Sequence, residues 1–160
     1  LRYGVLTHHH SDHVLGVAPY VNAGATVVAA RAHEQVVRDA APDGAQLTLE
    51  LVDERRVFDD DGQRVEIIDI GPTAHTEHLL VAWLPDSGLL FEADHFARPR
   101  TGVIPAANDS TRTFAEALRK HGLTPLRISS AHSPDLATPA DLRLALESTP
   151  KATKAPMVKF

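Results

Sequence analysis

The sequence predicts an α/β fold, classed as α+β in some schemes, built as one domain. Short apolar segments rich in β-branched residues alternate with segments of helical spacing, and Gly- or Pro-containing turns separate them. The 160 residues include 43% hydrophobic and 23% charged residues, which is the composition of a globular chain with a core of its own. We expect this domain to cover residues 1–148 and a tail to cover residues 149–160.

The first part of the chain alternates strand and helix. Residues 1–7 form an apolar strand-like segment, which is followed by a polar run over 8–13. Residues 14–21 are apolar and predict a short helix. Residues 25–30 are suited to a buried strand, and residues 31–41 have helical spacing until a Pro-Asp-Gly sequence ends them.

The middle of the chain predicts two hairpins. Residues 56–58 and 64–70 flank an Asp-Gly turn, and the second segment alternates polar and apolar side chains. Residues 79–84 and 89–93 are apolar strands joined by a turn that starts with Pro85 and ends with Gly88. Proline fixes φ and glycine accepts a positive φ, so this turn favours a tight reversal of the chain.

Two helices follow the hairpins. Residues 111–121 have helical spacing, with Asp109 or Ser110 as the expected N-cap. A second helix is predicted to begin after Thr138, because a Thr cap, a Pro at the first helical position and an Asp in the first turn all favour a helix start. Residues 126–129 between them predict a strand.

Composition excludes several classes of function. The net charge of -5 offers no basic stripe for nucleic acid, so we expect no nucleic-acid partner. The chain has no cysteine, so disulfides, thiolate nucleophiles and sulfur ligands are excluded. No apolar run approaches the roughly 20 residues of a membrane-spanning helix, so we expect no membrane partner. The chain opens without Met on a strand-like segment and therefore reads as the later part of a longer protein.

A dense group of potential metal ligands follows the first predicted strand. In the sequence Thr-His-His-His-Ser-Asp-His over residues 7–13, His8 and His10 can point together at one ion, while Asp12 and His13 can face a second. Imidazole nitrogen and carboxylate oxygen suit zinc at about 2.0–2.2 Å, and also iron or manganese. The alternative is a solvated histidine-rich loop, but the full H-x-H-x-D-H spacing after an apolar strand favours metal.

Three more candidate ligands also come directly after a predicted apolar strand. They are His75, Asp94 and His132. Ligand sites in α/β sheets gather at the carboxyl ends of strands. The second hairpin also places His75 and Asp94 at one edge, because antiparallel pairing brings its two outer ends together. Each residue alone is a weak signal, and their joint recurrence at strand ends predicts a site.

The motifs that carry these ligands resemble those of the metallo-β-lactamase superfamily, in the family's order. They are residues 7–16, the Gly-Pro-Thr-Ala-His-Thr sequence over 71–76, the Leu-Phe-Glu-Ala-Asp sequence over 90–94, and Ser-Ala-His over 130–132. The resemblance implies a four-layer αβ/βα sandwich with a dinuclear site between two sheets, lacking much of its N-terminal half. It also implies that His8, His10 and His75 hold one metal, that Asp12, His13 and His132 hold the other, and that Asp94 bridges both.

The resemblance implies a hydrolase that carries two divalent ions, with zinc expected and iron or manganese as alternatives. A bridging hydroxide would cleave an ester, lactone, thioester or related acyl bond of a small molecule, and Asp12 would orient the water or accept its proton. A relative of glyoxalase II or of the lactonases is favoured over a β-lactamase, since many β-lactamases lack an Asp where Asp94 stands. The alternatives are an iron-dependent oxidoreductase of the persulfide dioxygenase or flavodiiron type and an inactive metal-binding scaffold.

Several other polar residues are weaker candidates. His78 is a candidate catalytic residue that contacts substrate or orients a ligand, and the alternative is a His at the start of a strand with no role in the site. Strand alternation should turn His9 and His95 away from the site, and His33 and His121 lie on predicted helices, where we expect them to face solvent. The hydroxyls that can hydrogen-bond the ligands belong to Thr7, Thr76 and Ser11.

Overall fold

Two sheets form the centre of the protein, as a computed structural model that describes residues 1–60 and 62–149 shows. The first sheet has three parallel strands in chain order: β1 (Tyr3–Val5), β2 (Thr26–Ala30) and β3 (Thr48–Val52). The second has five strands in chain order: β4 (Arg55–Asp60), β5 (Gln63–Asp69), β6 (Leu80–Leu84), β7 (Leu89–Glu92) and β8 (Arg127–Ser130). Its strands are antiparallel except for the parallel pair β7 and β8.

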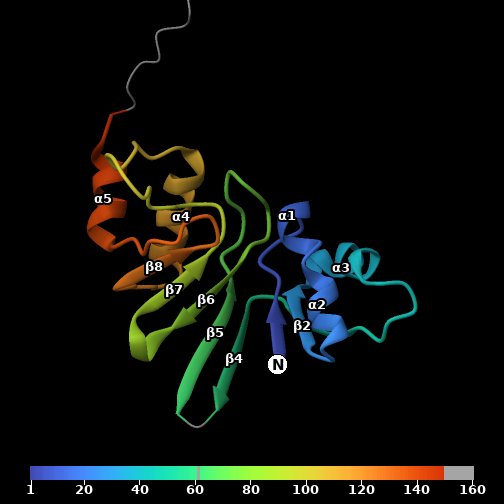
Figure 1. Cartoon of the computed structure of the whole chain (residues 1–160). Helices are drawn as coiled ribbons and strands as arrows, with labels where there is room; N and C mark the ends of the chain where they lie inside the picture. The colour runs from blue at the N-terminus through green and yellow to red at the C-terminus, as the bar shows by residue number, and fades with distance from the viewer. Residues whose placement is uncertain (61, 150–160) are drawn as a thin grey trace, which may run out of the picture.

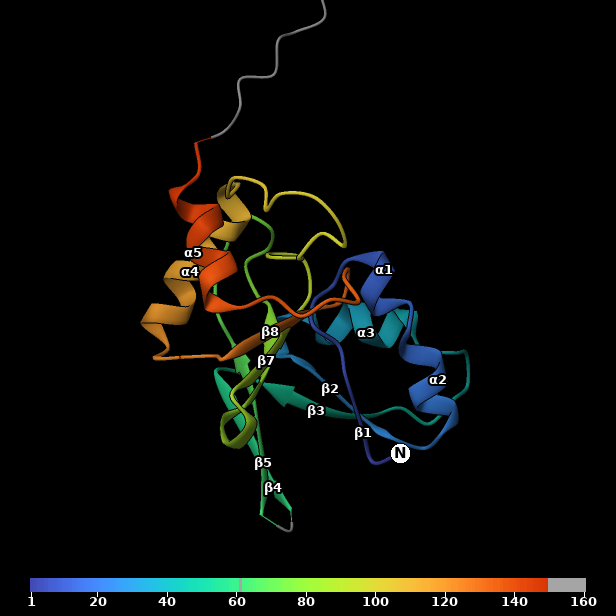
Figure 2. The same ribbon diagram turned by 60° about the vertical axis from the view of Figure 1, so that its left-hand side comes forward.

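Helices cover the outer faces of both sheets (Figures 1 and 2). The first sheet carries α1 (Ser11–Val14), α2 (Val17–Asn22) and α3 (Glu34–Ala40), the last preceded by the 3-10 helix η1 (Arg31–His33). The second sheet carries α4 (Asp109–Lys120) and α5 (Pro139–Glu147), and the 3-10 helix η2 (Pro85–Ser87) joins β6 to β7. The order helices, sheet, sheet, helices is the four-layer αβ/βα sandwich that the family resemblance implied.

Side-chain alternation along β2 explains why the first sheet is buried on both faces. Val27 and Ala29 pack with Val17 and Val37 of the helical layer. Val28 and Ala30 point the other way, into a core shared with the second sheet. A strand buried on both faces reads as a continuous apolar run, and residues 25–30 have this pattern.

Strand β5 divides its side chains between two cores in the same way. Ile67 faces the first sheet together with Leu80 of β6, and both are buried. Ile68 faces the opposite way and packs with Phe114 of α4, which is also buried. Three cores therefore lie between four layers.

Local sequence signals set most of the turns and helix starts. Gly88 adopts φ 62° after η2, so the β6–β7 hairpin has the reversal that its Pro and Gly predicted. Thr138 caps α5 in a capping box with Asp141, as expected. The cap of α4 is Asn108, whose side chain accepts the backbone N–H of Thr111, and the expected cap at Asp109 or Ser110 was wrong by one or two residues.

Other expectations require correction. Strand β3 was not anticipated, and the apolar segment expected as one helix over 14–21 belongs to two short helices, α1 and α2. His33 is buried, with 8% of its surface exposed, because it closes a 3-10 turn that points it inward.

Within the described residues no helix has the length and apolar character needed to cross a membrane. Residues 150–160 of the expected tail lie outside the described residues.

Candidate metal centre

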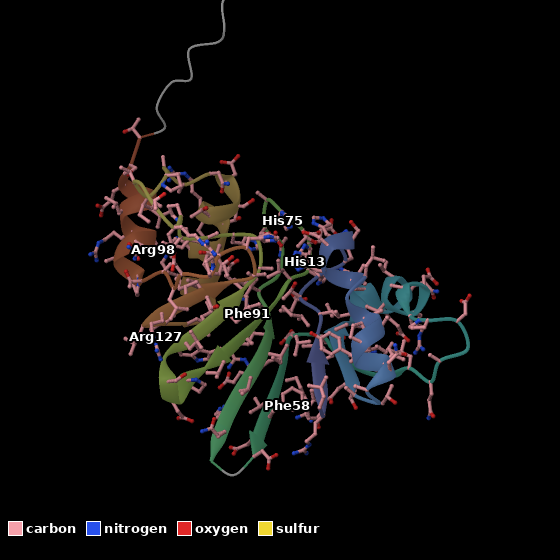
Figure 3. All side chains as sticks on the ribbon, viewed as in Figure 1. His13, Phe58, His75, Phe91, Arg98 and Arg127 are labelled. Atoms are coloured by element: carbon pink, nitrogen blue, oxygen red, sulfur yellow. The ribbon has the colours of Figure 1, made fainter. Side chains whose placement is uncertain are left out.

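The candidate ligands all follow the carboxyl ends of strands. His8, His10, Asp12 and His13 lie between the end of β1 and the first turns of α1. The other three, His75, Asp94 and His132, lie in the loops that follow β5, β7 and β8. Figure 3 shows His13 and His75 beside each other at the edge where the two halves of the molecule meet. The structure thus brings together the seven residues that the sequence predicted.

Three histidines form the first group. One ring nitrogen from each of His8, His10 and His75 lies within 4.8 Å of the others. The Nε2 atoms of His8 and His75 are 3.1 Å apart, although these residues are 67 positions apart in the chain. The three ring centroids are separated by 4.5 to 4.9 Å, so the rings converge on one point.

Two carboxylates and two histidines form the second group. It consists of Asp12, His13, Asp94 and His132, whose ligand atoms also lie within 4.8 Å of one another. The closest pair is His132 Nε2 and Asp94 Oδ1 at 2.8 Å. His13 Nε2 lies 3.1 Å from Asp94 Oδ2 and 3.3 Å from Asp12 Oδ2.

Asp94 connects the two groups. Its Oδ2 atom lies 3.5 Å from His8 Nε2 and 3.6 Å from His75 Nε2, as well as near His13. Two ligands held about 2.0–2.1 Å from a tetrahedral zinc ion are roughly 3.4 Å apart. These separations fit a carboxylate shared between two neighbouring cations.

Two buried atoms test whether a cation fits. His13 Nε2 and Asp94 Oδ2 are buried, and in the described part of the chain neither has a hydrogen-bond partner. An unsatisfied buried polar atom costs about 1–3 kcal/mol, and native proteins rarely retain one without a reason. A cation coordinated by both atoms would remove this cost, so the residues present fit a metal centre.

Comparison with known proteins identifies the family. The family model described as the metallo-beta-lactamase superfamily matches residues 1–140. The chain belongs to the metallo-beta-lactamase superfamily. A search of curated proteins finds no significant match.

Several solved structures have the same fold as this chain. The metallo-beta-lactamase from Pontibacter korlensis is 17% identical, with a TM-score of 0.67, and the match covers 91% of this chain and 67% of that one. The metal-soaked Flv1 flavodiiron core from Synechocystis sp. PCC6803 is 16% identical, with a TM-score of 0.68 over 90% of this chain and 41% of that one. The chemotaxis sensor ODP, solved as a peroxy diiron species, is 12% identical, with a TM-score of 0.64, and the match covers 89% of this chain and 67% of that one. The chain spans about two thirds of the length of the matching metallo-beta-lactamase.

The electrostatics of this superfamily member favour the protonation states that metal ligands need. Burial, followed by the charges of His13, His10, His75 and His9, lowers the pKa of His8 from 6.5 to about 3. Burial is also the main cause that lowers the pKa of His75. A backbone hydrogen bond is the largest cause that lowers the pKa of Asp12. Neutral imidazoles and an ionised carboxylate are the forms that bind cations.

The Thr7 hydroxyl orients two of the histidines. Its Oγ1 atom lies 3.1 Å from His8 Nδ1 and 3.5 Å from His13 Nδ1, and Thr7 is buried. A hydroxyl oxygen has two acceptor lone pairs, so it can accept an N–H from both rings. That arrangement leaves the Nε2 lone pairs facing the centre. The sequence could not show which of Thr7, Thr76 and Ser11 hydrogen-bonds the ligands. In the structure Thr7 contacts two of them, whereas Thr76 Oγ1 donates to the His78 carbonyl at 3.4 Å.

A buried network that the sequence did not reveal supports the loop of His75. Thr73 Oγ1 accepts the backbone N–H of His75 at 3.2 Å and contacts His95 Nε2 at 3.0 Å. His95 is buried, and its backbone N–H donates to the fully buried carboxylate of Glu92 at 2.8 Å. His95 belongs to neither ligand group, although its ring lies 5.8 Å from that of His75, and it links the β7 end to the His75 loop.

The remaining histidines lie outside both groups. His78 Nδ1 bonds Asp69 Oδ2 at 2.7 Å, and among the described residues no hydrogen bond or ring contact joins His78 to the seven candidate ligands. His9 is exposed, with its ring 4.8 Å from that of the buried His33. His121 is half-buried instead of facing solvent.

Proposed function

We propose that the protein is a metal-dependent hydrolase that cleaves an ester, lactone, thioester or related acyl bond of a small molecule. Two divalent ions, expected to be zinc, would be held by the seven residues, with Asp94 shared between them. The observation that supports this proposal is the position of Asp94 Oδ2, 3.1 Å from His13 Nε2 and 3.5 Å from His8 Nε2.

The residues of the site would have distinct roles in hydrolysis. When bound, two such cations lower the pKa of a shared water from 15.7 toward about 7 and polarise the scissile carbonyl. Asp12 is the more exposed of the two carboxylates of the site, with 60% of its side chain accessible against 15% for Asp94, and it stays ionised because its pKa is lowered. Its free oxygen can orient the attacking water and accept its proton.

An iron-dependent oxidoreductase is the second candidate. Its basis is the donor set, because nitrogen and oxygen ligands suit iron as well as zinc. The flavodiiron core has a TM-score as high as that of the β-lactamase, and at this identity both likenesses concern the fold alone. Metal analysis of protein produced without added zinc separates the two proposals, since iron retained through purification would favour oxidation.

The decisive experiment compares two variants from the same loop. His10→Ala removes a member of the first group, whereas His9→Ala removes an exposed neighbour that belongs to neither group. Both are assayed for bound metal and for hydrolysis of lactone, thioester, aryl ester and cephalosporin substrates. We expect His10→Ala to lose metal and at least 100-fold in kcat/KM, and His9→Ala to keep both. Full activity in His10→Ala would overturn the proposal.

A further inference from the structure

A cavity of about 380 Å³ adjoins the second ligand group. Asp94 and His132 form part of its wall, so one end of the cavity opens on the candidate metal centre. It extends from there between the loop that follows β7 and the two helices of the second sheet. Its further lining includes Phe96, Ala97, Pro105, Ala106 and Ala145.

Six of the eleven residues that line the cavity are apolar, and most of these are small. Four of the lining residues are alanines, which leave space that larger side chains would fill. Ala145 and Phe96 are buried, so this part of the wall is fixed by the packing of α5 and of the β7 end. Small-molecule sites usually occupy about 300–1,000 Å³, so the volume suits a compact group.

Two polar side chains of the wall, Asn108 and Thr111, are already bonded within the protein. Asn108 Oδ1 accepts the backbone N–H of Thr111 at 2.8 Å, and Thr111 Oγ1 donates to the His95 carbonyl at 2.7 Å. Among the described residues that line the cavity, none is Lys or Arg. An anionic group placed there would lose its hydration and gain no cation in return, which is costly.

We propose that this cavity binds the uncharged, compact acyl chain of the substrate, an inference that rests on the proposed hydrolase function. The acyl carbon would lie at the Asp94 end and the chain would extend toward Asn108. In the reaction, the bond between the acyl carbon and its leaving oxygen or sulfur breaks, and a water oxygen forms the new bond. One proton of the water goes to the leaving group, and the other is released to solvent as the carboxylate product forms.

A series of aryl esters measures the preference for chain length and charge. The zinc-loaded full chain is assayed with p-nitrophenyl acetate, butyrate and pentanoate, and with the p-nitrophenyl monoester of glutarate. Each buried methylene should raise kcat/KM roughly fourfold. Pentanoate and glutarate have the same number of carbons, so they differ in the terminal carboxylate, and we expect the glutarate ester to be at least 10-fold poorer. Equal rates across the series, or a preference for glutarate, would overturn the inference.

Variants that fill the cavity test its location. Ala106→Phe and Ala97→Phe add volume at partly exposed or exposed positions of the wall, where folding tolerates a larger side chain. Ala32→Phe is the matched control, because Ala32 is exposed and lies outside this cavity. We expect the pentanoate-to-acetate ratio of kcat/KM to fall toward 1 in both cavity variants and to persist in Ala32→Phe. An unchanged ratio in both cavity variants would refute the assignment.

A binding measurement separates failure of this inference from failure of the proposed function. Pentanamide and its anionic counterpart glutaramate are titrated into the protein, and backbone amide shifts are followed by NMR. Shifts of Phe96, Ala106 and Thr111 with pentanamide alone, absent in Ala106→Phe, would support the cavity assignment even if no ester is hydrolysed. Tighter binding of glutaramate, or no shifts at these residues, would refute it even if hydrolysis is found.

Discussion

At the scale of single residues, the function of the site depends on groups that hold the ligands as much as on the ligands themselves. Thr7 is the clearest case, since its hydroxyl lies between the Nδ1 atoms of His8 and His13. The two rings belong to different ligand groups, so one hydroxyl sets the orientation of both. Partners of this kind typically contribute 10–100-fold to metal affinity.

We therefore expect Thr7→Val to weaken metal binding by roughly 10–100-fold while the protein remains folded. Valine keeps the shape of the side chain, but it cannot accept the two ring N–H groups. Affinity is measured by competition with a chromophoric chelator, and folding by circular dichroism. Thr48→Val is the control, because Thr48 is an exposed β3 residue far along the chain from either group. Equal affinities in the two variants would show that Thr7 does not position the ligands.

The seven candidate ligands could be predicted from the sequence because each follows a strand that the local pattern reveals. The orientation of His78 could not be predicted, since it depends on Asp69, a residue nine positions away whose carboxylate bonds the ring at 2.7 Å. His33 was expected to face solvent, because a helical pattern does not distinguish the 3-10 turn that buries it. Local patterns thus identified which residues follow strands, but they did not identify the side-chain partner of His78 or the burial of His33.

At the scale of elements, β1 positions the first four candidate ligands, and its own position depends on close packing against α2. Gly4 lies under the ring of Tyr20, and a Cβ atom built on Gly4 would be 2.4 Å from the ring carbons Cγ and Cδ1. No side chain fits in that space unless the helix or the strand moves. The absence of a side chain at Gly4 therefore sets the distance between β1 and α2.

We expect Gly4→Ala to lower the free energy of unfolding by about 1–3 kcal/mol, which is the usual cost of overpacking. Adding Tyr20→Ala should recover part of this loss, because it removes the clashing ring. Urea denaturation of the wild type, both single variants and the double variant gives the coupling energy between the two positions. Additive losses, with no recovery in the double variant, would contradict close packing at this contact.

The elements that the sequence predicted correctly are those with strong local signals at both ends. The β6–β7 hairpin has Pro85 and Gly88 in its turn, and α5 has its Thr138 cap. Strand β3 was missed although residues 46–51 alternate polar and apolar side chains, which is the pattern of a partly exposed edge strand. Such an alternation does not identify the partner of the strand, and the parallel pairing of β3 with β2 is a tertiary contact.

At the scale of the whole molecule, the candidate metal centre lies where the two sheets join. Four of its residues follow β1 of the first sheet, and three come from loops of the second. A backbone hydrogen bond of 2.8 Å from Leu80 N–H of β6 to the Thr7 carbonyl already joins the sheets beside the site. Bound cations would add a second connection at the same place, between segments 67 residues apart in the chain such as His8 and His75.

Because the ligands converge only in the folded chain, cations that bind them should stabilise the fold. Zinc at about 100 times its dissociation constant adds roughly 2.7 kcal/mol, which corresponds to an increase in Tm of about 5–10 °C for a domain of this size. Calorimetry of the chelator-treated protein with and without added zinc measures the shift. We expect His9→Ala to retain it and Asp94→Asn to lose most of it, since Asp94 contacts both groups. If zinc left the Tm of the wild type unchanged, or raised that of Asp94→Asn equally, the two sheets would not be linked through a shared metal centre.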